Sequence, residues 1–460
     1  MAWVAVTRVH SRRLRFALLF AVLTAHNLSA EDSRASNVSP VSSPEKTTEA
    51  AEATDWWHGK WAAGDWGGNR EALEKKGVVF EFTYTAEVRD NTAGGINTNH
   101  ASEYLQNTNA SLDFFTEKFG LYSGGEFFVR YEGVLGEGIS NEHVGDTQLL
   151  SSIDAQPFNQ ISEFFYRHSI LNDTLHFKVG KQDGTGDFLA LTYGKDLTHS
   201  AYGCISNIPL PRFHNYALAA VVSYDATSWF SFATGVYDGE STGKTTGFDT
   251  AFERPFHEFS ILELTFKPQL AADLPTIFRV GTWHLRRDIP ALGVTPDPGA
   301  GPPPVAFRHD LGAYGEFEQL LCGFGKKPEK SSEEDAEKKE DDTAEKPDPS
   351  ADRGLSIFGQ LSWSPDDRNE TPRFFGAGIR AKGIFDARDA DVVGAGISSV
   401  LFAPRLRHLE GKSQESAIEF FYKVQASPFL FFQPDFQYIV KPDGNHRDAV
   451  TGGIRFQIAF

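Results

Sequence analysis

Apolar and polar side chains alternate at every second position along most of the chain after residue 77. In "FEFTYTAEV", Phe80, Phe82 and Tyr84 share one face, whereas Glu81 and Thr83 share the other. The same alternation recurs in "EFFVRYE", "TLHFKVGK", "IEFFYKVQ" and "GGIRFQIAF". A period of two is typical of β-strands that present different faces to different surroundings. The pattern therefore predicts an all-β protein.

The two faces of these segments differ in a way that narrows the fold class. Aromatic residues crowd the apolar face, and full charges recur on the opposite face. A soluble β-sandwich also alternates. In a membrane barrel, however, the apolar face contacts lipid with aromatic girdles and the charged face lines water. The content of the faces favours a transmembrane antiparallel up-and-down β-barrel.

About sixteen segments of roughly ten residues fit this pattern, which is the length that crosses a bilayer when tilted. An even number returns both chain ends to the periplasm. The segments begin near Val78, Tyr104, Gly125, Ile161, Thr174, Asn215, Ser228, Phe259, Thr276, His309, Gly354, Arg373, Asp391, Glu415, Leu430 and Ala449.

Connections between the segments alternate between short turns and long loops, as in porin-like barrels. Short turns include "LND", "DATS" and "ASPF". The long connections are residues 89–103, 132–160, 182–214, 238–258 and 286–308. One exception is the run 326–352 on a periplasmic turn. Its mixed charges and prolines, without apolar residues to bury, predict a disordered insertion in the 78–460 barrel.

The N-terminal region carries an export signal. A basic start, the apolar "FALLFAVL" and the "LSA" before residue 31 predict a signal peptide over residues 1–30. Residues 31–54, rich in Ser, Thr, Ala and Glu, are predicted to be a flexible leader.

A Trp- and Gly-rich periplasmic segment follows over residues 55–77. "NREALEKKG" predicts a short helix with Asn69 as N-cap and Gly77 as its C-terminal stop. Four of the eight Trp residues precede it, at positions 56, 57, 61 and 66. We expect them to pack this helix against the periplasmic mouth of the barrel, where interfacial indoles are common. Stacking on sugar at the periplasmic exit is the alternative.

Composition excludes several functions. The net charge of −18 argues against a nucleic-acid partner, which requires a basic face. The fourteen His residues occur in no metal-ligand spacing, so we expect no metal, no cofactor and no enzymatic activity. Cys204 and Cys322 lie toward opposite ends of the predicted barrel, which predicts two free thiols.

Longer stretches resemble a known family. "GDWGGNREALEKKGVVFEFTY", "LHFKVGKQDGTGDF" and especially "IEFFYKVQASPFLFFQPDFQYIVKPDG" are similar to the carbohydrate-selective porins (OprB family) of Gram-negative outer membranes. The resemblance spans nearly all of the mature chain, although the 326–352 insertion departs from the family pattern. Phe460 is similar to the C-terminal aromatic residue that the barrel assembly machinery reads in such proteins.

This resemblance implies a multi-pass outer-membrane barrel for passive, sugar-preferring diffusion, with ions passing as well. Its partners would be carbohydrate solutes, outer-membrane lipid and the assembly machinery. It also implies a homotrimer, with a monomer as the alternative. A wall mixing carboxylates, guanidinium groups and amides can replace the water around sugar hydroxyls. Binding must stay weak so that the solute leaves.

Candidate pore-lining residues follow from the strand alternation and from the loop that porins commonly fold into the lumen. The alternation directs inward Glu81, Glu126, Arg130, Lys178, Arg380, Glu419, Lys423, Gln425 and Arg455, and we add Arg167 and Arg279 from less regular segments. The 182–214 connection contributes Asp183, Asp187, Phe188, Tyr193, Lys195, His199, Tyr202 and Arg212. For any one of these, the alternative is a solvated wall residue without a role in selectivity.

Two other classes of function stay open at this stage. One is an outer-membrane or periplasmic hydrolase acting on glycans or lipids. The other is a secreted sugar-binding β-sandwich. Phe460 and the charged face of nearly every strand favour the pore over both.

Overall fold

The computed structural model of the chain describes residues 56–240, 257–270, 274–293, 305–325 and 353–460. The predicted signal peptide (1–30), leader (31–54) and charged insertion (326–352) lie outside the described residues.

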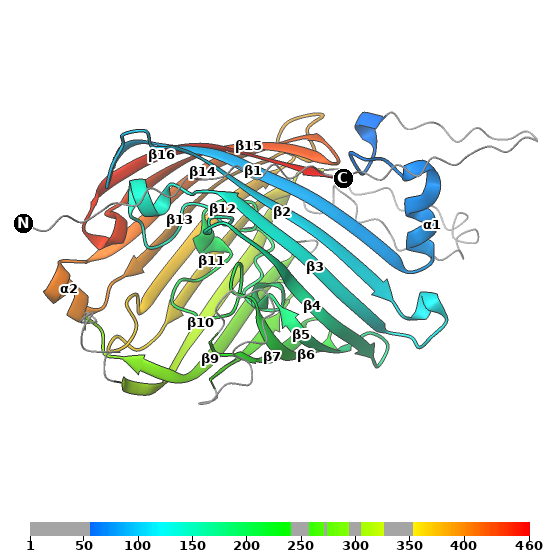
Figure 1. Cartoon of the computed structure of the whole chain (residues 1–460), viewed down its shortest axis with the longest axis horizontal. Helices are drawn as coiled ribbons and strands as arrows, with labels where there is room; N and C mark the ends of the chain where they lie inside the picture. The colour runs from blue at the N-terminus through cyan, green and yellow to red at the C-terminus, as the bar shows by residue number, and fades with distance from the viewer. Residues whose placement is uncertain (1–55, 241–256, 271–273, 294–304, 326–352) are drawn as a thin grey trace, which may run out of the picture. The chain divides into compact units, whose positions relative to one another are not determined.

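The described residues form sixteen antiparallel strands that close into a barrel (Figure 1). Each strand pairs with its neighbours in the chain, and the first strand pairs with the last. The barrel predicted from alternation is thereby confirmed. The strands are β1 (Val78–Gly95), β2 (Ser102–Phe115), β3 (Gly125–Gly136), β4 (Phe158–Ile170), β5 (Leu175–Gln182), β6 (Ala217–Thr227), β7 (Phe230–Asp238), β8 (Glu258–Phe266), β9 (Thr276–Pro290), β10 (Val305–Gly323), β11 (Gly354–Trp363), β12 (Arg373–Lys382), β13 (Val392–Leu401), β14 (Gln414–Ser427), β15 (Leu430–Val440) and β16 (Arg447–Ala459).

The first long connection is shorter than predicted. Residues 89–103 were expected to form a loop, but β1 continues to Gly95. Its pairing with β16 shifts register on either side of Ala93. Such bulges let a strand end keep its pairing while it bends, so alternation alone misplaced the strand end.

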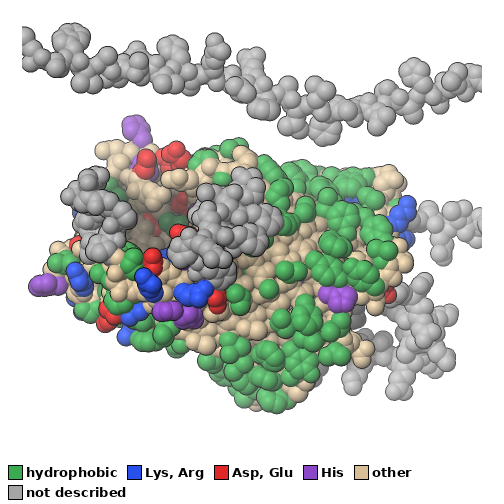
Figure 2. Space-filling view, turned by 60° about the horizontal axis from the view of Figure 1, so that its bottom comes forward, with side chains coloured by type: hydrophobic (Ala, Val, Ile, Leu, Met, Phe, Trp, Pro, Cys, Tyr) green, Lys and Arg blue, Asp and Glu red, His purple; other side chains and the backbone are tan. Residues whose placement is uncertain are grey.

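The wall of the barrel is apolar outside and polar inside. On β3, Phe127 is 50% exposed and Val129 is 37% exposed, whereas the intervening face carries Glu126 at 6% and Glu132 at 3%. Hydrophobic side chains cover much of the wall in Figure 2, and charged and His side chains gather toward one end. This burial pattern is the reverse of that of a water-soluble protein. It is the pattern expected where the outer face contacts lipid.

Two short α-helices lie at opposite ends of the barrel: α1 (Asn69–Lys75) and α2 (Pro404–Glu410) (Figure 1). None of the helices in the described ranges has both the length and the apolar character needed to cross a membrane. Cys204 and Cys322 are both free thiols.

The predicted N-cap of α1 is wrong. The helix begins at Asn69 itself, and the Asn69 side-chain amide donates to the carbonyl of Trp66 at 2.7 Å. Gly67 and Gly68 precede it with φ of 67° and 89°. This left-handed turn brings the carboxylate of Asp65 within 3.1 Å of the Glu71 backbone N–H, so Asp65 accepts from the first turn instead.

Arg70 attaches α1 to the seam where the barrel closes. Its Nη2 donates to the main-chain oxygen of Phe460 at 2.8 Å, and its Nη1 donates to the carbonyl of Phe80 at 3.2 Å. Its guanidinium lies 4.4 Å from the ring centroids of both Trp61 and Trp66. The indoles therefore enclose a cation that is itself bonded to β1 and to the chain end.

Candidate functional site

Two long connections fold back into the barrel. They are residues 137–157 between β3 and β4, and residues 183–216 between β5 and β6. Neither has a regular ladder to satisfy its backbone, apart from short turns such as η4 (Ser140–Val144) and η6 (Ser200–Tyr202). Buried backbone N–H groups need acceptors. Carboxylates on the inner face of the wall provide them.

Glu415 on β14 holds the 137–157 loop. Its carboxylate accepts from the backbone N–H of Thr147 at 2.7 Å and of Gln148 at 2.8 Å. It also accepts from the backbone N–H of Asp443 at 2.7 Å. Hydrogen bonds to an ionised acceptor are stronger than neutral ones. One wall residue thus joins this loop to the connection between β15 and β16.

The 183–216 loop is held by two further carboxylates. Glu419 accepts from the backbone N–H of Thr198 at 2.7 Å and of His199 at 3.0 Å. Glu318 on β10 accepts from the backbone N–H of Tyr193 at 2.6 Å. Because β10 and β14 are different parts of the wall, the loop is fastened at more than one point across the lumen.

Ion pairs add to these attachments. Asp196 of the same loop contacts Arg380 Nε at 2.8 Å and Lys423 Nζ at 3.0 Å. Burial alone would raise the pKa of Asp196. The two cations more than offset this effect and hold the pKa below its ordinary value. Asp196 is therefore a charged anchor between β12 and β14.

The aromatic residues expected at the constriction do not face solute. Phe188, Tyr202 and His199 are 2% exposed or less, and Tyr193 is 5% exposed. The ring of Tyr202 packs edge-on against Phe358 of the wall at 5.6 Å. Burial, followed by the charge of Arg89, lowers the pKa of His199 to about 3, so its imidazole is neutral. These side chains seat the loop, and that part of the constriction prediction is wrong.

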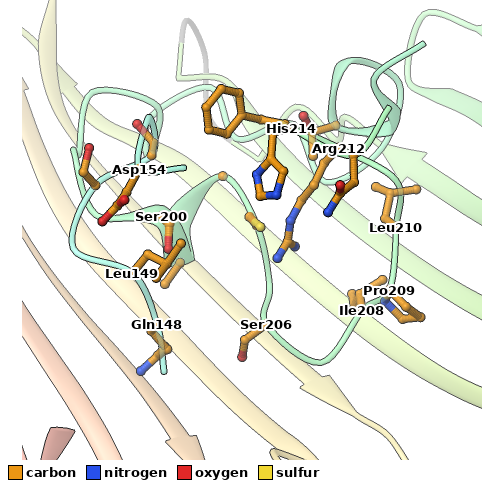
Figure 3. A pocket seen from close by; sticks show the side chains of 18 of the residues that line it. Gln148, Leu149, Asp154, Ser200, Ser206, Ile208, Pro209, Leu210, Arg212 and His214 are labelled. Carbon is orange, nitrogen blue, oxygen red and sulfur yellow. The ribbon is translucent and has the colours of Figure 1, made fainter. Parts of the chain in front are cut away.

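A cavity of about 610 Å³ lies between the two loops (Figure 3). Its lining comes from residues 147–154 of one loop and 185–215 of the other. Figure 3 shows Arg212 and His214 pointing into this space, with Asp154 on the opposite side. Volumes of this size are typical of small-molecule sites.

Polar atoms at the edge of the cavity lack protein partners. Gln148 Oε1 and Ser206 Oγ are buried and accept or donate no hydrogen bond among the described residues. Both residues line the cavity. Buried polar groups of this kind are usually satisfied by water or by a ligand. Ser152, Ser200 and Arg212 also line the cavity and remain exposed or half-buried, so these side chains can exchange hydrogen bonds with a hydroxylated solute.

The ionisable groups of the cavity have shifted pKa values. Burial, reinforced by the negative charge of Glu87, raises the pKa of Asp154 to about 6. Burial and then the positive charge of Arg212 lower the pKa of His214. Burial raises the pKa of the Cys204 thiol. At neutral pH the His214 imidazole and the thiol are therefore uncharged.

The sequence-predicted site residues lie in three settings. Ion pairs join Glu126 to Arg167, Lys178 to Asp187, and Arg380 through Asp196 to Lys423. Among the predicted residues, Arg212 is the one that lines the cavity. The remainder lie on the inward face of their strands or support a loop or turn: Glu81, Arg130, Asp183, Arg279, Glu419, Gln425 and Arg455.

Most of the cavity lining is not predicted by the sequence, including Gln148, Asp154 and His214. Gln148 and Asp154 belong to the 132–160 connection, which the sequence predicts only to be a long connection. One feature of the sequence could have indicated their position. The stretch "DTQLLSSIDAQ" of this connection contains few charges and several small polar residues. That composition suits a loop packed inside a polar lumen better than one in bulk water.

Comparison with known proteins identifies one family. The model of the carbohydrate-selective porin, OprB family, matches residues 99–460. Porin B of Pseudomonas aeruginosa is 23% identical over 440 residues, covering 87% of this chain and 91% of that protein. The putative porin QuiX of Acinetobacter baylyi is 21% identical over 456 residues, covering 89% and 95% respectively.

A solved structure shares the fold. The high-pH structure of Pseudomonas putida OprB superimposes with a TM-score of 0.73 at 20% identity, covering 88% of this chain and 99% of that one. The similarity extends over the barrel as a whole.

Proposed function

The chain belongs to the OprB family of carbohydrate-selective porins, and from this premise we propose that its solutes cross the barrel through the cavity between the 137–157 and 183–216 loops. The protein is an outer-membrane β-barrel of a Gram-negative bacterium, and its function is passive, sugar-preferring diffusion. The proposal adds where in the barrel sugars are preferred and which side chains provide that preference.

The observation that carries this proposal is the set of accessible polar side chains that line the cavity. The hydroxyls of Ser152 and Ser200 and the guanidinium of Arg212 belong to cavity-lining residues that are exposed or half-buried, and they offer both acceptors and donors. A sugar hydroxyl both donates and accepts, so such a lining can replace its hydration shell. The affinity stays low because few groups act at once, which a transport pathway requires.

The first test is a planar-bilayer recording with glucose titrated against the current. We expect stepwise conductance that glucose attenuates in a saturable manner. Current steps that no sugar affects would leave a pore without the proposed preference.

A second test asks whether solutes pass through this cavity. Ser206→Trp inserts a large side chain into the cavity and should lower both single-channel conductance and the effect of glucose. Ser102→Trp is the matched control, because Ser102 is exposed and lies two positions from the lipid-facing Tyr104 on β2. Equal conductance in the two variants would contradict the proposed route.

We further propose that Phe460 is the residue through which the assembly machinery recognises this barrel. The resemblance in sequence supports this proposal, together with the outer position of the Phe460 ring against Phe82 at 5.2 Å. Assembly as a homotrimer stays a prediction.

A further inference from the structure

Cations inside the barrel are mostly neutralised by carboxylates of the protein itself. Arg89 contacts Asp435 at 2.7 Å, and Arg455 contacts Glu87 at 2.9 Å. Arg279 contacts Glu318 at 2.7 Å. A guanidinium already paired with a carboxylate has its fork of donors occupied. These residues therefore have few free hydrogen-bond donors for a passing anion.

Arg212 is an exception to this pairing. It lines the cavity, is half-buried, and forms no ion pair with a carboxylate in the part of the chain that the structure describes. Figure 3 shows its side chain reaching into the open space beside the His214 ring. A partly desolvated guanidinium without a counter-charge attracts carboxylates more strongly than one in bulk water.

The rest of the described cavity lining places no carboxylate in contact with this guanidinium. Asp154 is the only carboxylate among the described residues that line the cavity, and Figure 3 places it across the space from Arg212. Its raised pKa also brings protonation close to neutral pH. His214 is neutral there because burial and Arg212 itself lower its pKa. The lining thus offers one open cationic fork, with the Asp154 carboxylate on the opposite side of the cavity.

We propose that this cavity prefers monosaccharides that carry a carboxylate, such as aldonic and uronic acids, over neutral sugars of the same size. The carboxylate pairs with the fork of Arg212, and the hydroxyls exchange hydrogen bonds with groups such as Ser152 and Ser200. This inference rests on the proposed route through the same cavity. The net charge of −18 works against anions in general, so the preference is local to this site.

The test compares gluconate with glucose in single-channel recordings of the full-length protein. Each solute is titrated, and the concentration that halves the open current is measured. A partly exposed charge pair is worth up to about fivefold in affinity. We therefore expect gluconate to act at about fivefold lower concentration than glucose. Acetate, which has the charge but not the hydroxyls, should attenuate the current only weakly.

Three variants locate the effect. Arg212→Gln should bring gluconate to the level of glucose, and Arg212→Lys should retain part of the preference. Arg407→Gln removes the same charge from the exposed face of α2, outside the cavity lining, and should keep the full preference. Resistance of each folded barrel to SDS confirms that the variants are assembled.

The outcomes separate this inference from the proposed function. Glucose attenuation with no tighter action of gluconate overturns the preference for sugar acids and leaves the sugar pathway intact. Equal loss of preference in Arg407→Gln overturns the role of Arg212. Acetate acting as strongly as gluconate overturns the preference for sugar acids, because the carboxylate alone would then account for the effect. No attenuation by either sugar overturns both proposals.

Discussion

Glu419 illustrates how a single wall residue determines the shape of the lumen. It accepts two backbone N–H groups of the 183–216 loop and the hydroxyl of Thr198 at 2.9 Å. The residue itself is fully buried. Removing the carboxylate would leave the loop donors without acceptors, at a cost of about 1–3 kcal/mol for each buried group.

We therefore predict that Glu419→Ala releases the loop without unfolding the barrel. Single-channel recordings should show larger current noise and frequent transient closures, because the loop moves within the lumen. Glu419→Gln, which keeps one acceptor oxygen, should be intermediate. Glu81→Ala is the control, since this inward residue is exposed and takes no part in holding the loop. A quiet channel in Glu419→Ala would show that other contacts suffice.

Asp154 makes the cavity sensitive to pH. Its pKa of about 6 lies above the ordinary value of 3.8, so its negative charge is lost as pH falls from 7.5 to 5.5. Losing this charge reduces repulsion of anions in a cavity that already contains Arg212. We predict that anion permeability relative to cation permeability rises over this interval, measured as the reversal potential in a KCl gradient.

The matched variant for the pH prediction is Asp154→Asn. Its cavity lacks the charge at every pH, so its anion preference should already be high at pH 7.5 and change less on acidification. An unchanged pH response in this variant would assign the effect to other carboxylates of the lumen.

At the scale of elements, the strands were far more predictable than the loops. Strands beginning at Val78, Gly125 and Thr276 were placed correctly, because alternation starts abruptly after a turn. β10 was expected near His309 but begins at Val305, where pairing with β9 overrides a less regular local pattern. The alternation of apolar and polar residues shows which face of a strand each residue occupies. A closed antiparallel barrel requires this assignment to hold along every strand.

The loop structure could not be predicted in the same way. Alternation correctly directed Glu419 inward, but its partner Thr198 is 221 positions away in the sequence. Nothing in the local pattern near Thr198 indicates that its backbone N–H needs that acceptor. Likewise, the aromatic residues of the loop were recognisable as important, but only the packed structure shows that Tyr202 meets the wall and not the solute. Long-range pairing of this kind is a property of the assembled barrel.

The N-terminal segment gives a prediction at the same scale. Because Trp61 and Trp66 enclose Arg70, which bonds to β1 and to the chain end, their loss should weaken the attachment of α1 to the barrel. We predict that Trp61→Ala combined with Trp66→Ala lowers the temperature of barrel unfolding and leaves the glucose titration unchanged. The opposite result, lost glucose attenuation with normal heat stability, would favour sugar stacking by these indoles.

At the scale of the whole molecule, closure of the barrel depends on contacts between its two ends. β1 and β16 pair from Thr83 with Ala459 up to Gly95 with Arg447. The Phe460 backbone N–H then donates to the carbonyl of Phe82 at 2.8 Å. This seam brings together residues at opposite ends of the described barrel, so it can form only when most of the chain is in place.

The variant Phe460→Ala distinguishes two roles of this residue: stabilising the pairing of β1 with β16, and recognition by the assembly machinery. Alanine keeps the backbone N–H that bonds to Phe82 and the main-chain oxygen that accepts from Arg70, and it removes the ring contact with Phe82. A single aromatic pair is worth about 0.5–1.5 kcal/mol beyond its buried area, so the variant should refold in detergent with a modest loss of heat stability. In cells, the proposed recognition of this residue predicts a severalfold lower amount of folded protein in the outer membrane. Comparable yields in cells would contradict recognition through Phe460, and failure to refold in detergent would assign the residue a structural role in closing the barrel.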